Sequence, residues 1–241
     1  NGSTSSLRVD FNGTSQVTGG LSGNGGVFAN NAPDTLSTLT VGAANISNTV
    51  WPTGGSGQNG KMVDNTTGTG GILGLTKTGT GTLTLEGNNT YSGPTTVKAG
   101  TLQAGARVTA FGMNSAVTVA SGATLALAGY AERIGSLAGA GTVDLANGTL
   151  VLGGDNSSQI FSGTLADGGS GSSGSVVKFG NGSIVLSNGA NTFVGNLAVA
   201  KGTVVLLESN SAGTGTIYAG GDSNVGGGTI LVSSPNSGFG G

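Results

Sequence analysis

Residues 75–85 read LTKTGTGTLTL, and residues 89–93 read NTYSG. The pattern returns once, as VVKFGNGSIVL at residues 176–186 and NTFVG at residues 191–195. Each copy contains, in the same order, a lysine, two glycines, alternating apolar residues, an aromatic residue and a closing glycine. A long internal repeat of this kind is typical of stacked structural units rather than of an active site.

The spacing between the two copies is nearly constant. Lys77 and Lys178 lie 101 residues apart, and Tyr91 and Phe193 lie 102 apart, so one residue is inserted within the unit. Fainter traces of the unit precede the first copy at larger offsets, which indicates longer loops there. We place the excess between residues 51 and 72, a stretch rich in Gly, Thr and Asn that should bulge from the fold.

Short segments of the chain alternate Thr with Leu or Val, which places apolar groups on one face of a strand and hydroxyl groups on the other. Turn residues separate these segments every ten or so positions. Helical periodicity is nearly absent, and AERI at residues 131–134 is at most one helical turn. The clearest predicted strands are residues 39–41, 82–85, 117–119, 124–127, 149–152 and 202–207.

This spacing fits a β-sandwich as well as a solenoid, and three further features favour the solenoid. The inward positions are mostly small aliphatic residues, Gly and Asn recur where a coil must turn sharply, and whole units repeat. We therefore predict an all-β fold, a right-handed parallel β-helix. Coils of roughly 20–25 residues at ~4.8 Å per rung give about ten rungs and a rod near 50 Å long.

We expect a single β-solenoid over residues 1–241. Residues 1–74 form a looser, loop-bearing first part, residues 75–175 form the first repeat unit with its spacer, and residues 176–241 form the second repeat unit and the C-terminal rungs. The chain begins with Asn1 rather than Met, so we expect a processed or excised piece.

Composition excludes several functions. Eight basic and ten acidic residues give a net charge of −2, without the clustered cations that nucleic acid or anionic lipid requires. The chain contains no cysteine, which excludes disulfides and thiolate metal sites, and no histidine, the commonest general base at neutral pH. No apolar run approaches the length of a membrane-spanning helix, so we expect no membrane insertion within this chain.

The motif at residues 75–93 resembles the autotransporter-associated β-strand repeat, which belongs to the passenger domains of type V secreted bacterial proteins. The resemblance covers about residues 75–207, and residues 21–50 more faintly. It implies a right-handed parallel β-helix on the cell surface or secreted from the cell. The second copy departs from the pattern, because Phe179 follows its lysine and Asn181 lies between its glycines.

Two motifs suggest chemistry and are better explained as loops. GGDSN at residues 220–224 is similar to the Gly-Asp-Ser block of some esterases, but such a serine needs a base, and the chain has no histidine. GSGSSG at residues 169–174 satisfies G-x-G-x-x-G. A predicted strand follows it, whereas a dinucleotide site needs a helix there.

Charged and aromatic residues leave alternatives open. Asp144, Asp155 and Asp167 could align on one face, as in calcium-binding or sugar-cleaving solenoids, although isolated solvated acids are the simpler interpretation. The repeated lysines could form a ligand-binding row, or could discourage lateral strand association. Trp51 and the Tyr91/Phe193 pair could stack on sugars, but core or turn packing is the preferred interpretation.

We assign no catalytic, cofactor-binding or metal-binding residue, and we expect no cofactor and no nucleic-acid partner. The predicted function is a non-enzymatic extracellular stalk or fibre segment of an adhesin-like protein, with end-to-end self-association into filaments as one form of it. The alternatives are a polysaccharide-degrading β-helix enzyme and an adhesin that binds a host or cell-surface ligand through loops such as residues 52–71.

Overall fold

A computed structural model of the chain describes residues 8–21, 26–46, 48–50, 61–105, 109–169, 171–220 and 227–233. Within these ranges every helix-or-strand element is a β-strand, and every strand pairing is parallel. The strands form four sheets of ten, six, five and three members.

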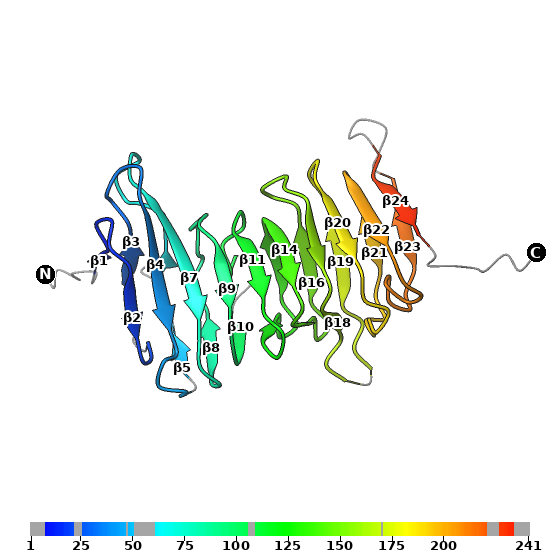
Figure 1. Cartoon of the computed structure of the whole chain (residues 1–241), viewed down its shortest axis with the longest axis horizontal. Coiled ribbons are helices and arrows are strands. Elements are labelled where there is room, and N and C mark those ends of the chain that lie inside the picture. The colour runs from blue at the N-terminus through cyan, green and yellow to red at the C-terminus, as the bar shows by residue number, and fades with distance from the viewer. Residues whose placement is uncertain are drawn as a thin grey trace, which may run out of the picture.

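The ten-stranded sheet runs along the whole molecule (Figure 1). Its strands, in spatial order, are β2 (Gln16–Thr18), β4 (Leu36–Val41), β7 (Ile72–Lys77), β9 (Thr95–Val97), β11 (Ala116–Val119), β14 (Ser136–Gly139), β17 (Gln159–Phe161), β20 (Ser183–Leu186), β22 (Thr203–Leu206) and β24 (Thr229–Val232).

The remaining sheets complete the coils. The six-stranded sheet contains β5 (Asn48–Val50), β8 (Thr82–Leu85), β10 (Thr101–Ala104), β12 (Thr124–Ala126), β15 (Thr142–Asp144) and β18 (Thr164–Ala166). The three-stranded sheet contains β1 (Arg8–Asp10), β3 (Val27–Ala29) and β6 (Lys61–Met62). The five-stranded sheet contains β13 (Ala131–Ile134), β16 (Thr149–Leu152), β19 (Ser175–Lys178), β21 (Leu197–Val199) and β23 (Ile217–Ala219).

The chain visits these sheets in turn and returns to each one a rung further along the axis, which is the path of a parallel β-solenoid. The predicted parallel β-helix is therefore confirmed. Its right-handed sense stays a prediction, supported by the strong preference of parallel crossover connections for that hand. β1 and β24 lie at opposite ends of an elongated molecule (Figure 1).

Coils are 18 to 26 residues long except in one place. Leu75 pairs with Thr95, 20 residues along the chain, whereas Leu39 pairs with Leu75, 36 residues along. This long coil contains the stretch predicted to bulge, of which residues 51–60 lie outside the described residues. The extra residues lie between β4 and β7 in sequence, and these two strands pair in register over six residues.

The inward-facing rows form one continuous apolar core. In the six-stranded sheet the same register position is filled by an aliphatic residue in five successive rungs, and each of these side chains is at most 1% exposed. Parallel in-register stacking places like beside like, so small aliphatic residues fill a narrow interior without voids. These residues are Leu83, Leu102, Leu125, Val143 and Leu165.

The outward-facing row beside it is equally regular and consists of hydroxyl residues. Each of these strands begins with a threonine, which the β-branched side chain favours at a half-exposed position. The row contains Thr82, Thr101, Thr124, Thr142 and Thr164. Apolar and polar positions thus alternate along these five strands, which fixes the register of their rungs.

One local expectation was wrong. Residues 131–134, assigned at most a helical turn, form strand β13 and pair with β16. Glu132 is fully buried in this strand, and its Oε2 accepts a hydrogen bond from the Ala110 N–H at 2.8 Å. A polar side chain therefore joins β13 to the preceding coil at a place where the backbone ladder is interrupted.

Candidate functional site

The repeated lysine lies inside the fold. Lys77 ends β7 and is 1% exposed. Its Nζ donates to the carbonyl oxygens of Thr78 at 2.6 Å and Gly79 at 2.8 Å, where the chain turns after the strand. A third hydrogen bond, of 3.1 Å, reaches the carbonyl of Ala99 in the next coil. Burial lowers the pKa of the Lys77 ammonium below its ordinary value.

Lys178 makes the same arrangement in the second copy and is also 1% exposed. Its Nζ donates to the carbonyls of Phe179 at 2.6 Å and Gly180 at 2.9 Å, and approaches the carbonyl of Lys201 in the next coil at 3.4 Å. Burial lowers the pKa of Lys178, and the charge of Asp155 partly opposes this. Each lysine thus joins a corner of one coil to the next.

The two lysines do not form a row. Lys77 belongs to β7 of the ten-stranded sheet, whereas Lys178 belongs to β19 of the five-stranded sheet. The hypotheses of a ligand-binding lysine row and of exposed lysines that discourage strand association are both wrong, because the side chains are buried and lie on different sides. Each repeat copy spans two coils. The strands of the first copy belong to the ten- and six-stranded sheets, whereas those of the second copy belong to the five- and ten-stranded sheets, so the second copy begins on a different side of the solenoid.

The repeated asparagine explains the next part of the motif. Asn89 is 2% exposed and lies between two coils. Its Oδ1 accepts the N–H of Met62 at 2.8 Å, and its Nδ2 donates to the carbonyl of Ala110 at 2.7 Å. The side-chain amide therefore takes the place of a peptide group in the ladder, at a rung where no strand forms.

Asn191 does the same in the second copy. Its Oδ1 accepts the N–H of Leu165 at 2.8 Å, and its Nδ2 donates to the carbonyl of Ser211 at 2.7 Å. Asn89 and Asn191 were missed as key residues, because Asn was interpreted only as a turn former. Their repetition two residues before each aromatic side chain was the signal that could have identified them.

The repeated aromatic residues belong to the core, as preferred from the sequence. Tyr91 is 1% exposed and Phe193 is fully buried. The Tyr91 hydroxyl is 2.7 Å from Thr95 Oγ1, which is in turn 2.8 Å from Ser115 Oγ. Burial raises the pKa of Tyr91. Neither ring is available to stack on a sugar. Trp51 lies outside the described residues.

Two of the three aspartates, Asp155 and Asp167, hold loops in place through hydrogen bonds. Asp155 accepts hydrogen bonds from the Ser136 hydroxyl at 2.7 Å and from both the N–H and the hydroxyl of Ser157 at 3.0 Å. It therefore fixes the loop that follows β16. A carboxylate that already accepts three hydrogen bonds is poorly placed to serve as a general base.

Asp167 is 4% exposed and accepts the backbone N–H groups of Gly174 at 2.8 Å and Val194 at 2.7 Å. It is a buried loop anchor and not a solvated acid, so the simpler interpretation was wrong for this residue. Asp144, in β15, is half-buried, and its Oδ1 is buried without a hydrogen-bond partner among the described residues. Among the described residues no cluster of three or more acidic side chains could hold a metal ion.

The structure describes most of the GSGSSG stretch but only one residue of the GGDSN stretch. Residue 170 of the GSGSSG stretch lies outside the described residues, and β19 follows directly at Ser175, so the strand predicted after this stretch is confirmed. Of the GGDSN stretch only Gly220 is described, and the remainder of that motif lies outside the described residues. No helix in the described part of the chain has the length and hydropathy needed to cross a bilayer.

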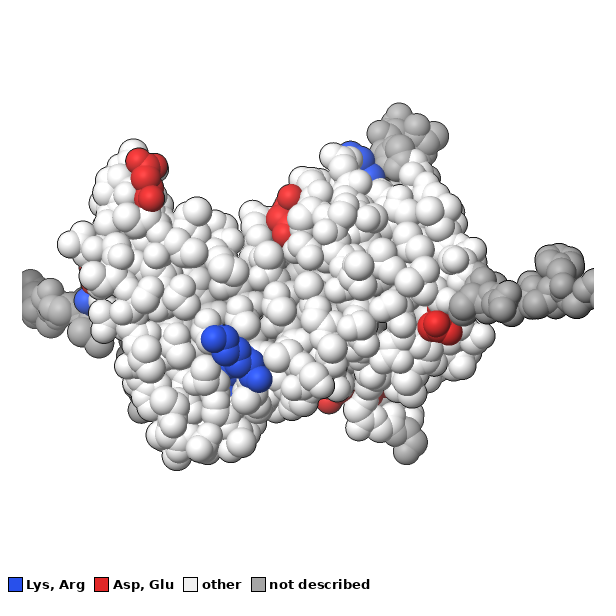
Figure 2. Space-filling model, viewed as in Figure 1, with Lys and Arg blue, Asp and Glu red and all other residues white. Residues whose placement is uncertain are grey.

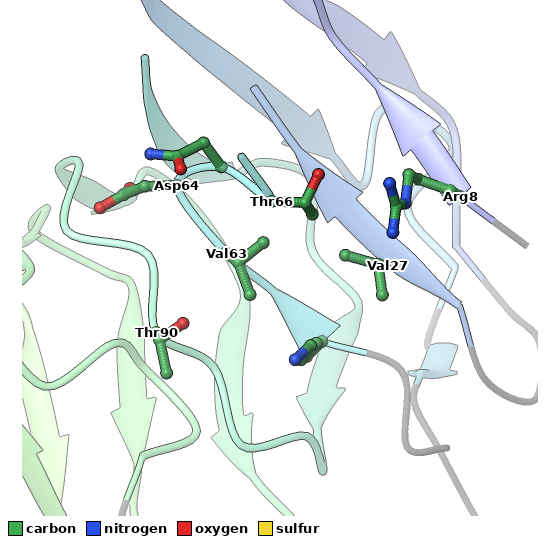
Figure 3. Close-up of a pocket in the computed structure, with 8 residues that line it drawn as sticks. Arg8, Val27, Val63, Asp64, Thr66 and Thr90 are labelled. Atoms are coloured by element: carbon green, nitrogen blue, oxygen red, sulfur yellow. The ribbon is translucent and has the colours of Figure 1, made fainter. Parts of the chain in front are cut away.

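A cavity of about 510 Å³ lies beside the three-stranded sheet (Figure 3). Val27 and Val63 lie between Arg8 on one side and Thr90 on the other (Figure 3). Lys61 also lines the cavity. This cavity combines two cations, one carboxylate (Asp64), one amide (Asn65), apolar side chains and hydroxyl groups, and no sequence pattern had singled it out.

Polar groups at one edge of the cavity are already occupied by the fold. Asp64 accepts the N–H and hydroxyl of Ser92 at 2.8 and 2.7 Å and the N–H of Leu73 at 3.1 Å. The Thr66 hydroxyl donates to Asn31 Oδ1 at 3.2 Å, which leaves its oxygen lone pairs free to accept.

Comparison with known proteins identifies the type of the repeat. The family model described as Passenger-associated-transport-repeat matches residues 75–104 and 176–206, the two copies that contain the buried lysines. This chain carries autotransporter-associated repeats. Each matched stretch begins in or beside the strand that ends with the lysine and ends in the second strand after the asparagine, so it contains the complete two-coil unit.

One curated relative is the adhesin BmaC autotransporter of Brucella suis biovar 1 (strain 1330). It is 37% identical over 146 residues, which is 59% of this chain and 4% of the relative's length. The chain therefore spans a small part of that relative. In the structure, each of the two matched repeats forms successive coils of the β-solenoid.

Proposed function

We propose that this chain is a rigid, non-enzymatic segment of an autotransporter passenger, which holds adhesive parts of that protein away from the cell. The observation that carries the proposal is the ten-stranded parallel sheet, which continues without a break from β2 to β24 (Figure 1). A continuous ladder over one apolar core resists bending and local unfolding.

Two further observations support a spacer. The polar side chains that recur in both repeat copies, the buried lysines and asparagines, bond one coil to the next. The relative is named as an adhesin, which supports a surface or secreted location and a role in adhesion for the protein that contains this chain.

Small-angle X-ray scattering of the purified chain tests the rod directly. We expect a stiff particle near 50 Å long, from about ten rungs at ~4.8 Å. Antibodies raised against the chain should label intact cells of the source bacterium without permeabilisation. Scattering from a flexible coil, or labelling that requires broken cells, would overturn the proposal.

A second candidate function, end-to-end self-association, is favoured by the outermost rungs. Val17 in β2 is 72% exposed, and Leu231 and Val232 in β24 are 52% and 74% exposed. β2 and β24 are the edge strands of the ten-stranded sheet, and open strand edges with apolar side chains are templates for another strand. A further coil of a longer passenger would satisfy these edges equally well.

Negative-stain electron microscopy distinguishes stacking of separate copies from a chain that stays single. Long fibres that shorten when Val232→Lys is introduced would support stacking of separate copies. Single short rods at every protein concentration would exclude it and would leave the spacer proposal intact.

A further inference from the structure

We propose that the cavity beside β1, β3 and β6 binds a linear acidic polysaccharide, which lies along the solenoid axis with its carboxylates on Arg8 and Lys61. The inference goes beyond the spacer role, because it gives this end of the rod a ligand of its own.

The two cations hold fixed positions relative to each other. Arg8 pairs in register with Val27, and Val27 pairs with Lys61, so the cations are two rungs apart on the same outward row. Two rungs correspond to about 10 Å between their Cα atoms. This is close to the length of one disaccharide in an extended glycan chain, so carboxylates on alternate sugars would meet both cations.

The cations are also available. Both side chains are exposed, and no ion pair joins either one to a carboxylate in the described part of the chain. Asp10, two residues from Arg8, accepts the N–H and Nδ2 of Asn31 at 3.0 and 2.9 Å and the N–H of Asn12 at 3.0 Å. These hydrogen bonds to Asn31 are the main cause that lowers the pKa of Asp10, and the charge of Arg8 is the smallest contribution.

The cavity floor suits a sugar ring between the two charges. Val27 is partly buried and offers a small apolar surface to the C–H face of a pyranose, and Val63, which is 6% exposed, lies beneath it as the apolar floor. The exposed hydroxyls of Thr66 and Thr90 lie at the edge, where they can exchange hydrogen bonds with sugar hydroxyls.

Other polyanions fit less well. A peptide strand would bind by extending the sheet at β1, its open edge, and would run parallel to the strands, so it would not reach Lys61 two rungs away. Nucleic acid gains its affinity from many phosphate contacts, and this cavity offers two cations. The face shown in Figure 2 carries isolated charges separated by broad uncharged surface, with no basic tract beside them.

Calorimetric titration of the whole chain with a hexasaccharide containing one uronic acid per disaccharide tests the proposal. A neutral hexasaccharide of the same length is the control ligand. We expect binding of the acidic sugar alone, weakened as salt is raised. The double variant Arg8→Gln/Lys61→Gln should lose about tenfold in affinity or more, from two lost charge-assisted contacts.

The matched control is Lys98→Gln. Lys98 is an exposed cation that follows β9 and does not line the cavity, so its removal should leave the affinity for the acidic sugar unchanged. Thermal melting confirms that each variant stays folded. The proposal is overturned by absence of binding, by equal loss in Lys98→Gln, by equal binding of the neutral sugar, or by tighter binding of an acidic peptide. None of these outcomes bears on whether the chain is a rigid rod.

Discussion

The ammonium group of each buried lysine donates hydrogen bonds to three carbonyl groups at a corner of the solenoid. Lys77→Met keeps the aliphatic stem but leaves the carbonyls of Thr78, Gly79 and Ala99 without this donor. We expect a loss of about 2 kcal/mol in the free energy of unfolding, typical of a removed charged hydrogen-bond donor. Urea denaturation measures it. Lys98→Met, at an exposed lysine, should change stability by less than about 0.5 kcal/mol, and an equal loss there would contradict the clamp.

The lowered pKa of Lys77 predicts a pH dependence. The ammonium has its ordinary pKa of 10.5 when unfolded and a lower one when folded. In the interval between these values the unfolded chain binds more protons, so stability rises with pH as it approaches 10.5. The urea midpoint of the wild type, measured relative to Lys77→Met across this interval, should therefore increase with pH. A decrease would show that the folded pKa is raised.

Residue type alone did not predict where these lysines lie. A lysine at the end of an alternating strand has the sequence signature of an exposed gatekeeper, and strand periodicity gives no sign of converging carbonyls. Only the turn after the strand, with Gly79 and the following coil in place, creates a site that satisfies a buried ammonium. The aromatic positions were predictable, because an apolar ring has no comparable polar alternative.

The asparagine bridge shows how a strand can be absent without breaking the ladder. Asn191→Ala leaves the N–H of Leu165 and the carbonyl of Ser211 without partners inside the fold. We expect about 2–3 kcal/mol of destabilisation, since two buried backbone groups become unsatisfied. Differential scanning calorimetry checks this. Asn196→Ala, at an exposed position of the same coil, is the control, and comparable melting of both variants would refute the bridge.

Turns between strands depend on glycines of two kinds. Gly153 has φ of +122°, and a Cβ there would overlap the carbonyl oxygen of Phe179 in the next coil. Gly122 has φ of +79° with open space around it. Gly122→Ala should cost about 1 kcal/mol of backbone strain, and Gly153→Ala about 3 kcal/mol or more, because a backbone contact must also open. Chemical denaturation of the two variants distinguishes them, and equal costs would contradict close stacking at this corner.

Strands were predicted better than the sides to which they belong. Alternation of Thr with Leu or Val identifies β8, β12 and β16, because period two is a direct consequence of the pleat. The side of the solenoid depends on the sum of all preceding turn lengths. Coils here range from 18 to 36 residues, so the rotation between the two repeat copies could not be read from their spacing.

The whole molecule is a rod with few charges, and it is held together mainly by the stacking of one coil on the next. Its overall architecture was predictable, since repetition and uniform small inward residues both require neighbours along one axis. The cavity at Arg8 and Lys61 was not, because its cations are 53 residues apart in sequence and meet only through the register of β1, β3 and β6.

Register between neighbouring coils is the claim on which every other statement depends. The chain has no natural cysteine, so engineered pairs report on it cleanly. Val185 and Val205 face each other on β20 and β22, and their Cα atoms lie about 5 Å apart, within disulfide range, whereas Val185 and Thr203 are about 8 Å apart. Oxidation of Val185→Cys/Val205→Cys should therefore give a complete intramolecular disulfide by mass spectrometry, and Val185→Cys/Thr203→Cys should give little. Efficient cross-linking of the second pair, or of neither, would contradict parallel in-register stacking.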